Sequence, residues 1–410
     1  MNGWNKVSLS ELGKVSRGKS KHRPRNDPKL YGGNYPFIQT ADVKNANFYI
    51  DSYSQTYNEY GLKQSKLWDK DTLCITIAAN IAESALLNFP ACFPDSIVGF
   101  LPQEGKSDVR YVKYMLDNYK SEFQKRSKGA TQDNLSVSKI NSLKMSVPPH
   151  SYQVQIADII STYDTLIDNN QKRIKILEEM AQRLYTEWFV KFKFPEHEKV
   201  KMVDSSTKHG KIPERWEVKK LANLINPQYG LTTSTVTIER SYKFLRGTDI
   251  NKNSYIDWRF VPYCDVSEEK MNKYKISVGD VFIIRMADPG KIGICETNVN
   301  AIFASYLMRL NIGKSLTPYY LYYFLKSDKY QNFILGSSTG TTRKSINSKQ
   351  VANIEIVIPS DKIMSKFEEN ISLLRSQLTS LLSSIGVFSR MRDLLIENLI
   401  TGKRVLKEEI

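Results

Sequence analysis

One stretch of this 410-residue sequence matches a phosphate-binding pattern. Residues 13–20 read Gly-Lys-Val-Ser-Arg-Gly-Lys-Ser, the spacing of a loop whose backbone N–H groups and lysine surround phosphates while the serine binds magnesium. That chemistry needs a helix directly after the loop, and Pro24 and Pro28 disfavour one there. The sequence therefore predicts a basic loop that binds a phosphate backbone, although a merely solvated charge run has the same composition.

A second set of residues imitates a nuclease centre. Asp95, followed by residues 104–106 (Glu-Gly-Lys), has the order of two carboxylates that hold magnesium. Glu104 lies between Pro102 and Gly105, which predicts a turn where such a centre needs a strand. The Asn/Asp-Pro-Pro-Tyr/Phe tetrapeptide of adenine methyltransferases does not occur in the sequence. We therefore predict no catalytic residues in this chain.

The cysteines and the net charge narrow the possible classes further. No Cys-x-x-Cys pair occurs and the histidines do not cluster near the cysteines, so we predict no metal ligands and no disulfide framework. Scattered thiols suit a reducing cytoplasm, and we expect no membrane span, because no apolar run reaches about 20 residues. The formal net charge of +16, from 59 basic and 43 acidic residues, favours a polyanionic partner, although a soluble lysine-rich surface gives the same count.

The segments that carry these residues occur twice in the chain. Residues 35–43, Tyr-Pro-Phe-Ile-Gln-Thr-Ala-Asp-Val, match residues 242–250, Tyr-Lys-Phe-Leu-Arg-Gly-Thr-Asp-Ile. Further along, residues 129–136 match 340–347, and residues 144–148 match 355–359. The order is kept, and the two copies stay 207 to 211 residues apart. Because this period is too long for a solenoid, it indicates a duplicated domain.

Each copy reads as an α/β domain of roughly 150 residues followed by one long helix. Apolar runs predict strands at 73–78, 281–285 and 354–358. Helices are expected at 108–124, capped by Ser107, and at 319–333, opened by Thr317 and Pro318. Prolines at 148–149 and 359 mark the boundaries, so we expect domains at 1–148 and 201–359 and helical segments at 149–200 and 360–410.

Both helical segments repeat residues in alternating steps of three and four, the pattern of a coiled-coil seam. Each seam has one charged or amide interruption, Asn170 in the first and Arg392 in the second, and such polar groups can fix the register of the helices. The first seam comprises Ile160, Tyr163, Ile167, Asn170, Ile174, Leu177, Ala181, Leu184 and Trp188. The second comprises Phe367, Ile371, Leu374, Leu378, Leu381, Ile385, Phe388, Arg392, Leu395 and Leu399. We expect the helices to pair antiparallel, with packing of each helix on its own domain as the alternative. The first seam spans about 42 Å, enough to hold two domains about one DNA turn, or about 34 Å, apart.

Taken in order, these motifs resemble the specificity subunits of type I restriction–modification systems over the whole chain. The resemblance rests on residues 129–136 with 146–149, on 184–192, on 212–216 and on 395–403. At 152–153 and 363–364 the sequence departs from the Glu-Gln that the family often has there. The implied fold is α+β, with two similar α/β target-recognition domains in a pseudo-two-fold arrangement, joined by two long antiparallel coiled-coil helices.

The resemblance also implies a function. The chain would bind a split target in double-stranded DNA, one part per domain, and bridge two modification subunits that methylate adenine. Restriction subunits that hydrolyse ATP and cleave DNA would join this core. No cofactor is expected on this chain, since S-adenosylmethionine, ATP and magnesium would belong to the partner subunits. Two alternatives stay open: a self-contained DNA methyltransferase or endonuclease, and a coiled-coil scaffold whose basic charge is incidental.

Loops at matching places in the two copies are the best candidates for DNA contacts, because polar and basic side chains reach groove edges and phosphates. The candidates form four pairs of matching segments, which are 17–25 with 229–235, 39–44 with 246–248, Asn80 with Arg285 and Lys291, and 128–134 with 341–344. Each candidate could instead be a cap, a turn or a solubilising group. In the first domain the candidates are Arg17, Lys19, Lys21, Arg23, Arg25, Gln39, Thr40, Lys44, Asn80, Lys128, Thr131, Gln132 and Asn134. In the second domain they are Tyr229, Thr232, Thr233, Arg246, Thr248, Arg285, Lys291, Thr341, Thr342, Arg343 and Lys344.

Overall fold

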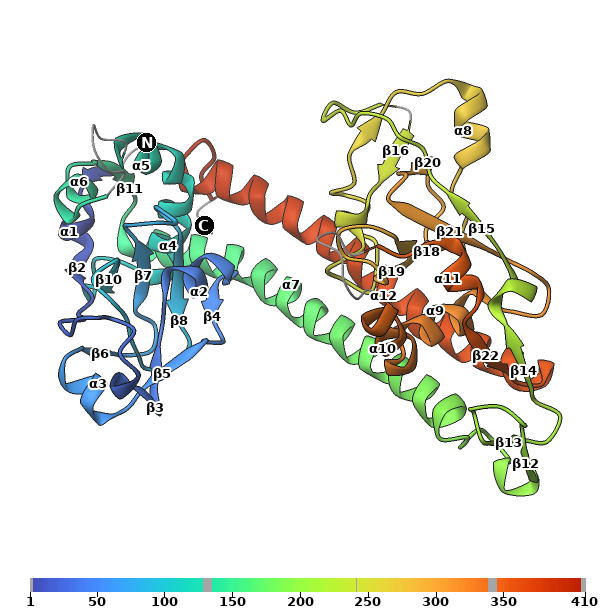
Figure 1. The fold of residues 1–410 in the computed structure, drawn as a ribbon. Helices are drawn as coiled ribbons and strands as arrows, with labels where there is room; N and C mark the ends of the chain where they lie inside the picture. The colour runs from blue at the N-terminus through green and yellow to red at the C-terminus, as the bar shows by residue number, and fades with distance from the viewer. Residues whose placement is uncertain (1–2, 128–134, 241, 338–344, 407–410) are drawn as a thin grey trace. The chain divides into compact units, whose positions relative to one another are not determined.

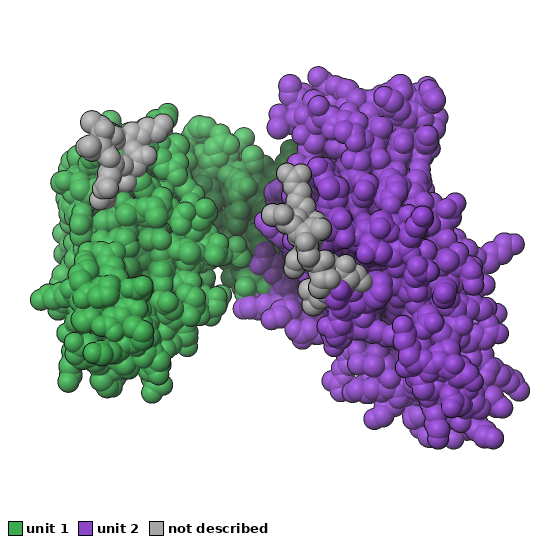
Figure 2. Space-filling model, viewed as in Figure 1, with its two compact units in different colours: residues 1–168, 387–410 green, residues 169–386 purple. Residues whose placement is uncertain are grey.

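A computed structural model describes residues 3–127, 135–240, 242–337 and 345–406 (Figure 1). The chain divides into two compact units, which Figure 2 shows in different colours. Unit 1 comprises residues 1–168 and 387–410, and unit 2 comprises residues 169–386. Each unit therefore contains one α/β domain together with a part of each long helix.

Unit 1 is built on two sheets and a short strand pair. The larger sheet has the order β2 (Gly13–Arg17), β10 (Ile97–Pro102), β7 (Leu73–Thr76), β8 (Ser84–Leu87) and β4 (Tyr49–Ile50). The smaller has the order β5 (Gln55–Tyr57), β3 (Tyr31–Phe37), β9 (Ala91–Cys92) and β6 (Leu67–Trp68), and β1 (Asn5–Val7) pairs with β11 (Met145–Val147). Every residue of β7 and β8 is buried, as expected for short apolar runs inside a sheet.

Unit 2 repeats this topology, which confirms the duplication. Its larger sheet has the order β15 (Ile225–Tyr229), β21 (Leu307–Ile312), β18 (Val281–Ile284) and β19 (Ile292–Ile294). In its smaller sheet β16 (Tyr242–Leu245) lies between β17 (Tyr263–Cys264) and β20 (Ala301–Phe303). The pairing of β16 with β20 is parallel, as is that of β3 with β9. Finally β14 (Glu217–Lys220) pairs with β22 (Glu355–Ile358), as β1 does with β11.

Shorter elements complete the two units. Unit 1 has α1 (Leu9–Leu12), α2 (Thr40–Asn45), α3 (Glu59–Lys63) and α6 (Val137–Asn141). Unit 2 has α8 (Glu268–Tyr274), α11 (Ser348–Ala352) and a hairpin of β12 (Met202–Asp204) and β13 (Lys211–Pro213).

The helix that follows the larger sheet is broken in both units, which corrects two predictions. In unit 1, α4 (Val109–Asn118) and α5 (Lys120–Ser127) replace one helix, and in unit 2, α9 (Pro318–Lys326) and α10 (Asp328–Ser337) do so. Ser327 has an extended backbone and its hydroxyl donates to the Phe324 carbonyl at 2.6 Å, which ends α9. The predicted cap Ser107 donates to the Leu12 carbonyl at 2.7 Å instead, and the Asp108 carboxylate caps α4.

The long helices are α7 (His150–Tyr185) and α12 (Asp361–Leu395), and each ends in one π-helical turn, at Thr186–Val190 and Ile396–Ile400. The predicted seams face inward, since every seam residue is buried or half-buried. In unit 1, Ile160 near the start of α7 shares a core with Leu399 at the end of α12. In unit 2, Tyr185 at the end of α7 shares a core with Phe367 near the start of α12. Each core therefore joins the start of one long helix to the end of the other, as the predicted antiparallel pairing requires.

The segment Asp361–Ile400 is long and apolar enough, by length and composition, to cross a membrane, which the sequence reading did not anticipate. Its apolar stripe instead packs inside the protein: Phe367 and Ile371 are fully buried in the core of unit 2, and Ile400 is buried in the core of unit 1. The segment also carries the buried Arg375. Helices in protein cores commonly have this composition.

Candidate nucleic-acid interface

The basic loop that follows β2 is held at a glycine that occurs in both units. A Cβ added to Gly18 would lie 2.3 Å from the Pro94 carbonyl oxygen, and one added to Gly230 would lie 2.3 Å from that of Ala304. The Gly18 N–H donates to the Ile97 carbonyl at 2.8 Å. Only glycine permits such a close approach. In both units, therefore, the chain leaving the first strand of the larger sheet runs against the loop before β10 or β21.

Asp95 anchors this basic loop. Its Oδ1 lies 2.5 Å from Nη2 of Arg25, and its Oδ2 lies 3.7 Å from Nη2 of Arg23. Asp95, the first carboxylate of the nuclease-like pattern, thus neutralises part of the charge of the loop. Glu104, the second, lies in a turn, as predicted. The three remaining candidates of the loop have no acidic partner among the described residues: Arg17, Lys19 and Lys21. These three basic side chains are therefore the ones most available to a DNA phosphate.

The second pair of candidate positions forms a repeated cap. The Gln39 N–H donates to Oδ2 of Asp42 at 2.7 Å, and the Arg246 N–H donates to Oδ2 of Asp249 at 2.8 Å. The Arg246 guanidinium also binds Asp249, at 3.1 Å through Nε and 2.8 Å through Nη2, and these bonds raise the pKa of Arg246. The structure gives both positions a capping role, and their DNA contacts stay predictions, as do those of the surface residues Thr40, Lys44 and Thr248.

The third pair lies at the tips of the β7–β8 and β18–β19 hairpins. Left-handed backbone conformations occur at Ala79 (φ 61°) and Ala82 (φ 62°), and 208 residues later at Ala287 (φ 72°) and Gly290 (φ 88°). The two tips therefore have the same backbone path. A non-glycine residue in this conformation is strained, and such strain concentrates at functional sites. The candidates at these tips are the half-buried Asn80 and Arg285 and the exposed Lys291.

The fourth pair, Lys128, Thr131, Gln132 and Asn134 with Thr341, Thr342, Arg343 and Lys344, lies outside the described residues. The residues just after it are described and join the hairpin tips. The Leu135 N–H donates to the Ile77 carbonyl at 3.0 Å, and the Ile346 N–H donates to the Arg285 carbonyl at 2.9 Å. In both units, therefore, the described residue that follows the fourth segment is bonded to the strand end at the third segment.

In unit 2 the structure also brings the first candidate segment to this tip. The Arg285 guanidinium stacks on the ring of Tyr229, 4.4 Å from its centre. Asn251, which follows the second segment, donates from Nδ2 to Asp288 at 3.0 Å. Thr232 donates to the Ser305 hydroxyl at 2.9 Å, and its neighbour Thr233 is half-buried. Tyr229, Asn251 and Ile346, which are distant from one another in the sequence, therefore all contact residues of the β18–β19 tip.

A buried ionic network in unit 2 was missed by sequence reasoning. The Arg375 side chain is 1% exposed and binds Glu296 through Nε at 2.6 Å and through Nη2 at 2.5 Å. Its Nη2 also donates to the Ser254 carbonyl at 2.9 Å, and the Tyr319 hydroxyl donates to Glu296 at 3.0 Å. Despite the cost of burial, these bonds hold the pKa of Arg375 above its usual value. The network fixes α12 to the α/β domain of unit 2.

Unit 1 contains a related anchor at the predicted polar position of the second seam. Nη1 of Arg392 binds Oδ1 of Asp164 on α7 at 2.9 Å, and the Tyr114 hydroxyl of α4 donates to the other carboxylate oxygen. Arg392 was found because it interrupts the apolar repeat. Arg375 lies one residue beyond a seam position, where a charged residue is usually exposed, so the periodicity gave no signal for it.

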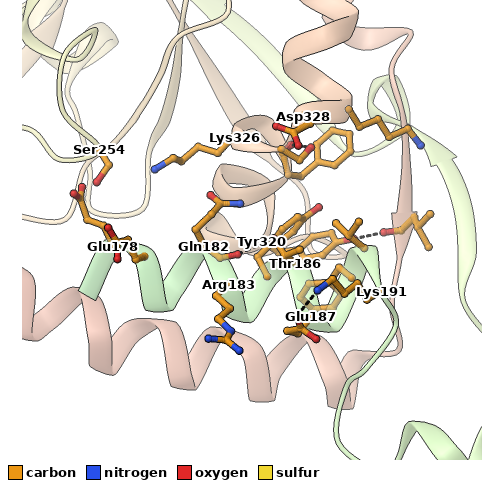
Figure 3. Close-up of a pocket in the computed structure, with 18 of the residues that line it drawn as sticks. Glu178, Gln182, Arg183, Thr186, Glu187, Lys191, Ser254, Tyr320, Lys326 and Asp328 are labelled. Carbon is orange, nitrogen blue, oxygen red and sulfur yellow. Dashed lines mark hydrogen bonds and ion pairs between the residues drawn. The ribbon is translucent and has the colours of Figure 1, made fainter. Parts of the chain in front are cut away.

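A cavity of about 1220 Å³ opens in unit 2 beside α7 and the α9–α10 junction (Figure 3). Glu178, Gln182 and Arg183 line it from α7, and Lys326 lies across from them. Burial raises the pKa of Glu178 and lowers that of Lys326, so both groups are shifted toward their neutral forms. Among the described residues, no three His, Cys, Asp or Glu side chains gather as a metal site would require.

The two-fold repeat of an α/β domain with a long helix matches a class of proteins that carry DNA specificity domains. The family model described as "Type I restriction modification DNA specificity domain" matches residues 1–179 and 213–382, and this chain belongs to that family. The match covers both α/β domains and large parts of both long helices.

Known specificity subunits are similar to this chain over most of its length. The type I restriction enzyme MjaIX specificity subunit of Methanocaldococcus jannaschii is 23% identical over 424 residues, covering 99% of this chain and 94% of the relative. The EcoBI specificity subunit of Escherichia coli is 22% identical over 375 residues, covering 87% of this chain and 76% of the relative. A crystal structure of the type I restriction–modification S subunit from M. genitalium has the same fold, with a TM-score of 0.62 at 14% identity over 97% of this chain and 96% of that one.

Proposed function

We propose that this chain is the DNA-recognition subunit of a type I restriction–modification complex and that it reads a bipartite target in double-stranded DNA. The observation that carries the proposal is the repeated topology with different side chains at matching loop positions. A shared framework positions both domains alike, while different loops let each domain read its own half-site. Family membership supports the same function, and a self-contained methyltransferase or endonuclease is not favoured.

The duplicated layout also supports the proposed partners. Two similar domain–helix modules offer two similar docking surfaces, which suits two modification subunits that transfer methyl groups to adenine. Restriction subunits would join this core and supply ATP hydrolysis and DNA cleavage. We assign S-adenosylmethionine, ATP and magnesium to these partners and no cofactor or catalytic residue to this chain. All four cysteines are free and buried, in keeping with a reducing cytoplasm.

Reconstitution tests the proposal. The purified chain is incubated with DNA, magnesium, ATP and S-adenosylmethionine, alone and together with its cognate modification subunits. We expect adenine methylation at one bipartite sequence in the complete mixture only, and neither the chain alone nor the modification subunits alone should produce it. Methylation or cleavage by the lone chain would contradict the proposal and favour the self-contained enzyme.

A further inference from the structure

Arg285 lies at the β18–β19 tip, over the ring of Tyr229, and its backbone is fixed on both sides. Its N–H donates to the Tyr306 carbonyl at 2.9 Å, and its carbonyl accepts the Ile346 N–H at 2.9 Å. The next residue, Met286, forms an isolated β-bridge with Ser345. The position from which the side chain projects is therefore set by the sheet and by the segment before α11.

The aromatic platform under Arg285 is also fixed. Tyr229 is the last residue of β15, and its hydroxyl oxygen accepts the Ser348 N–H at 3.1 Å. Partial burial would raise the pKa of Tyr229, but the bond from Ser348 and the charge of Arg285 outweigh burial and lower it. Tyr229 is 38% exposed, so the residue supports the guanidinium and also faces solvent. Stacking of this kind orients a planar guanidinium.

Arg285 differs from most described arginines of its domain in having no acidic partner. The paired arginines bind a carboxylate at 2.5 to 3.3 Å: Arg240 with Asp265, Arg246 with Asp249, Arg259 with Asp257, and Arg309 with Asp280. In the described part of the chain, no carboxylate pairs with Arg285, and its buried Nε has no hydrogen-bond partner. Its two terminal amino groups, which have no acceptor among the described residues, are therefore free for an external acceptor, whereas the buried Nε is not.

The matching positions in unit 1 hold different residues. Ile77 stands where unit 2 has Arg285, as the shared tip geometry and the bonds to Leu135 and Ile346 establish. Arg17, the last residue of β2, stands where unit 2 has Tyr229. If both domains dock on DNA alike, a basic side chain that only contacts the phosphate backbone would be expected at the same place in both. A side chain that distinguishes the half-sites would differ between them, as this one does.

We propose that Arg285, held on Tyr229, recognises a guanine in the half-site read by the second domain. This inference rests on the proposed function. Guanine presents O6 and N7 as paired acceptors in the major groove, and the two terminal amino groups of a guanidinium match that pair. A correct bidentate contact contributes about 1–3 kcal/mol, so replacing the G·C pair should weaken binding about 5- to 140-fold. The ammonium group of lysine cannot reproduce this planar fork.

The experiment uses the chain assembled with its cognate modification subunits. Adenine methylation is mapped on genomic DNA for the parent complex and for Arg285→Lys and Arg285→Gln, and affinities are measured for duplexes that vary one base pair at a time. We expect the parent target to contain a G·C pair in one half-site that becomes degenerate in both variants. The other half-site should stay unchanged, and its retention shows that the variant complex is folded and assembled.

Lys291→Gln is the matched control, because it removes a charge from the exposed side of the same hairpin. It should weaken binding to all sequences alike and reduce the salt dependence, as loss of a phosphate contact does. The inference is overturned if neither half-site contains a G·C pair that the variants relax, or if Arg285→Lys behaves like Lys291→Gln. If the parent complex methylates no bipartite sequence at all, the proposed function fails, and the inference with it.

Discussion

The ion pair between Arg375 and Glu296 offers a quantitative test of how the long helix α12 is fixed to unit 2. Replacing Arg375 with methionine keeps most of the side-chain volume and removes the charge. Glu296, whose side chain is 6% exposed, would then be buried without its counter-charge. Removing one partner of a buried ion pair typically costs about 3–5 kcal/mol. We therefore expect the free energy of unfolding of unit 2 to fall by about that amount.

The double variant Arg375→Met with Glu296→Leu separates the loss of the pair from the burial of an unpaired charge. Replacing both members of a buried pair with apolar residues is often nearly neutral, so the double variant should recover most of the lost stability. Amide hydrogen exchange read by mass spectrometry over α9 and α12 gives the local free energy of opening. Unit 1 provides an internal reference in every sample.

Arg392→Met is the matched control, because it breaks the corresponding anchor on α12 in unit 1. It should accelerate exchange in α4, whose Tyr114 shares Asp164 with Arg392, and leave α9 unchanged. The reasoning would be refuted by a loss below about 1 kcal/mol in Arg375→Met. It would equally be refuted if the double variant were as unstable as the two single changes added together, because the residues would then not be coupled.

Two further predictions concern charge and pH. Replacing Lys19 and Lys21 with glutamine should weaken DNA binding to all sequences and reduce the slope of log affinity against log salt by about 0.9 per lost phosphate contact; Arg25→Gln should change the slope less, because Asp95 already neutralises Arg25. Titrations at several salt concentrations measure both, and equal slopes for all variants would exclude the loop from the interface. Burial and the charge of Lys329 lower the pKa of His209 in the folded protein. The contribution of neutral His209 to stability is therefore fully present above the unfolded-state pKa of about 6.5 and is lost as pH falls through the lower folded-state pKa. Denaturant unfolding at pH 7.5 and 5.5 should show this loss in the parent and a smaller one in His209→Gln, and an equal loss in both would remove His209 as its cause.

The sequence by itself determined the features that repeat or that depend on neighbouring residues. The duplication was readable because residues 35–43 and 242–250 keep the same order of apolar and polar side chains. The seam residues of the long helices were readable because a helix returns to the same face every 3.6 residues. The turn at Glu104 followed from the adjacent Pro102 and Gly105. In each case the residues that determine the feature are neighbours in the sequence or recur at a fixed spacing.

Tertiary structure alone decided which distant side chains meet. Asp95 pairs with Arg25 across 70 positions of sequence, and Arg375 reaches Glu296 across 79. Asp108 caps α4 because Ser107 is used by the carbonyl of Leu12, 95 positions away. A charged or hydroxyl side chain has several possible hydrogen-bond partners, and the local sequence does not determine which one it binds. The fold determines the partner, because a polar group that is buried away from water must form its hydrogen bonds with the groups that the fold brings next to it.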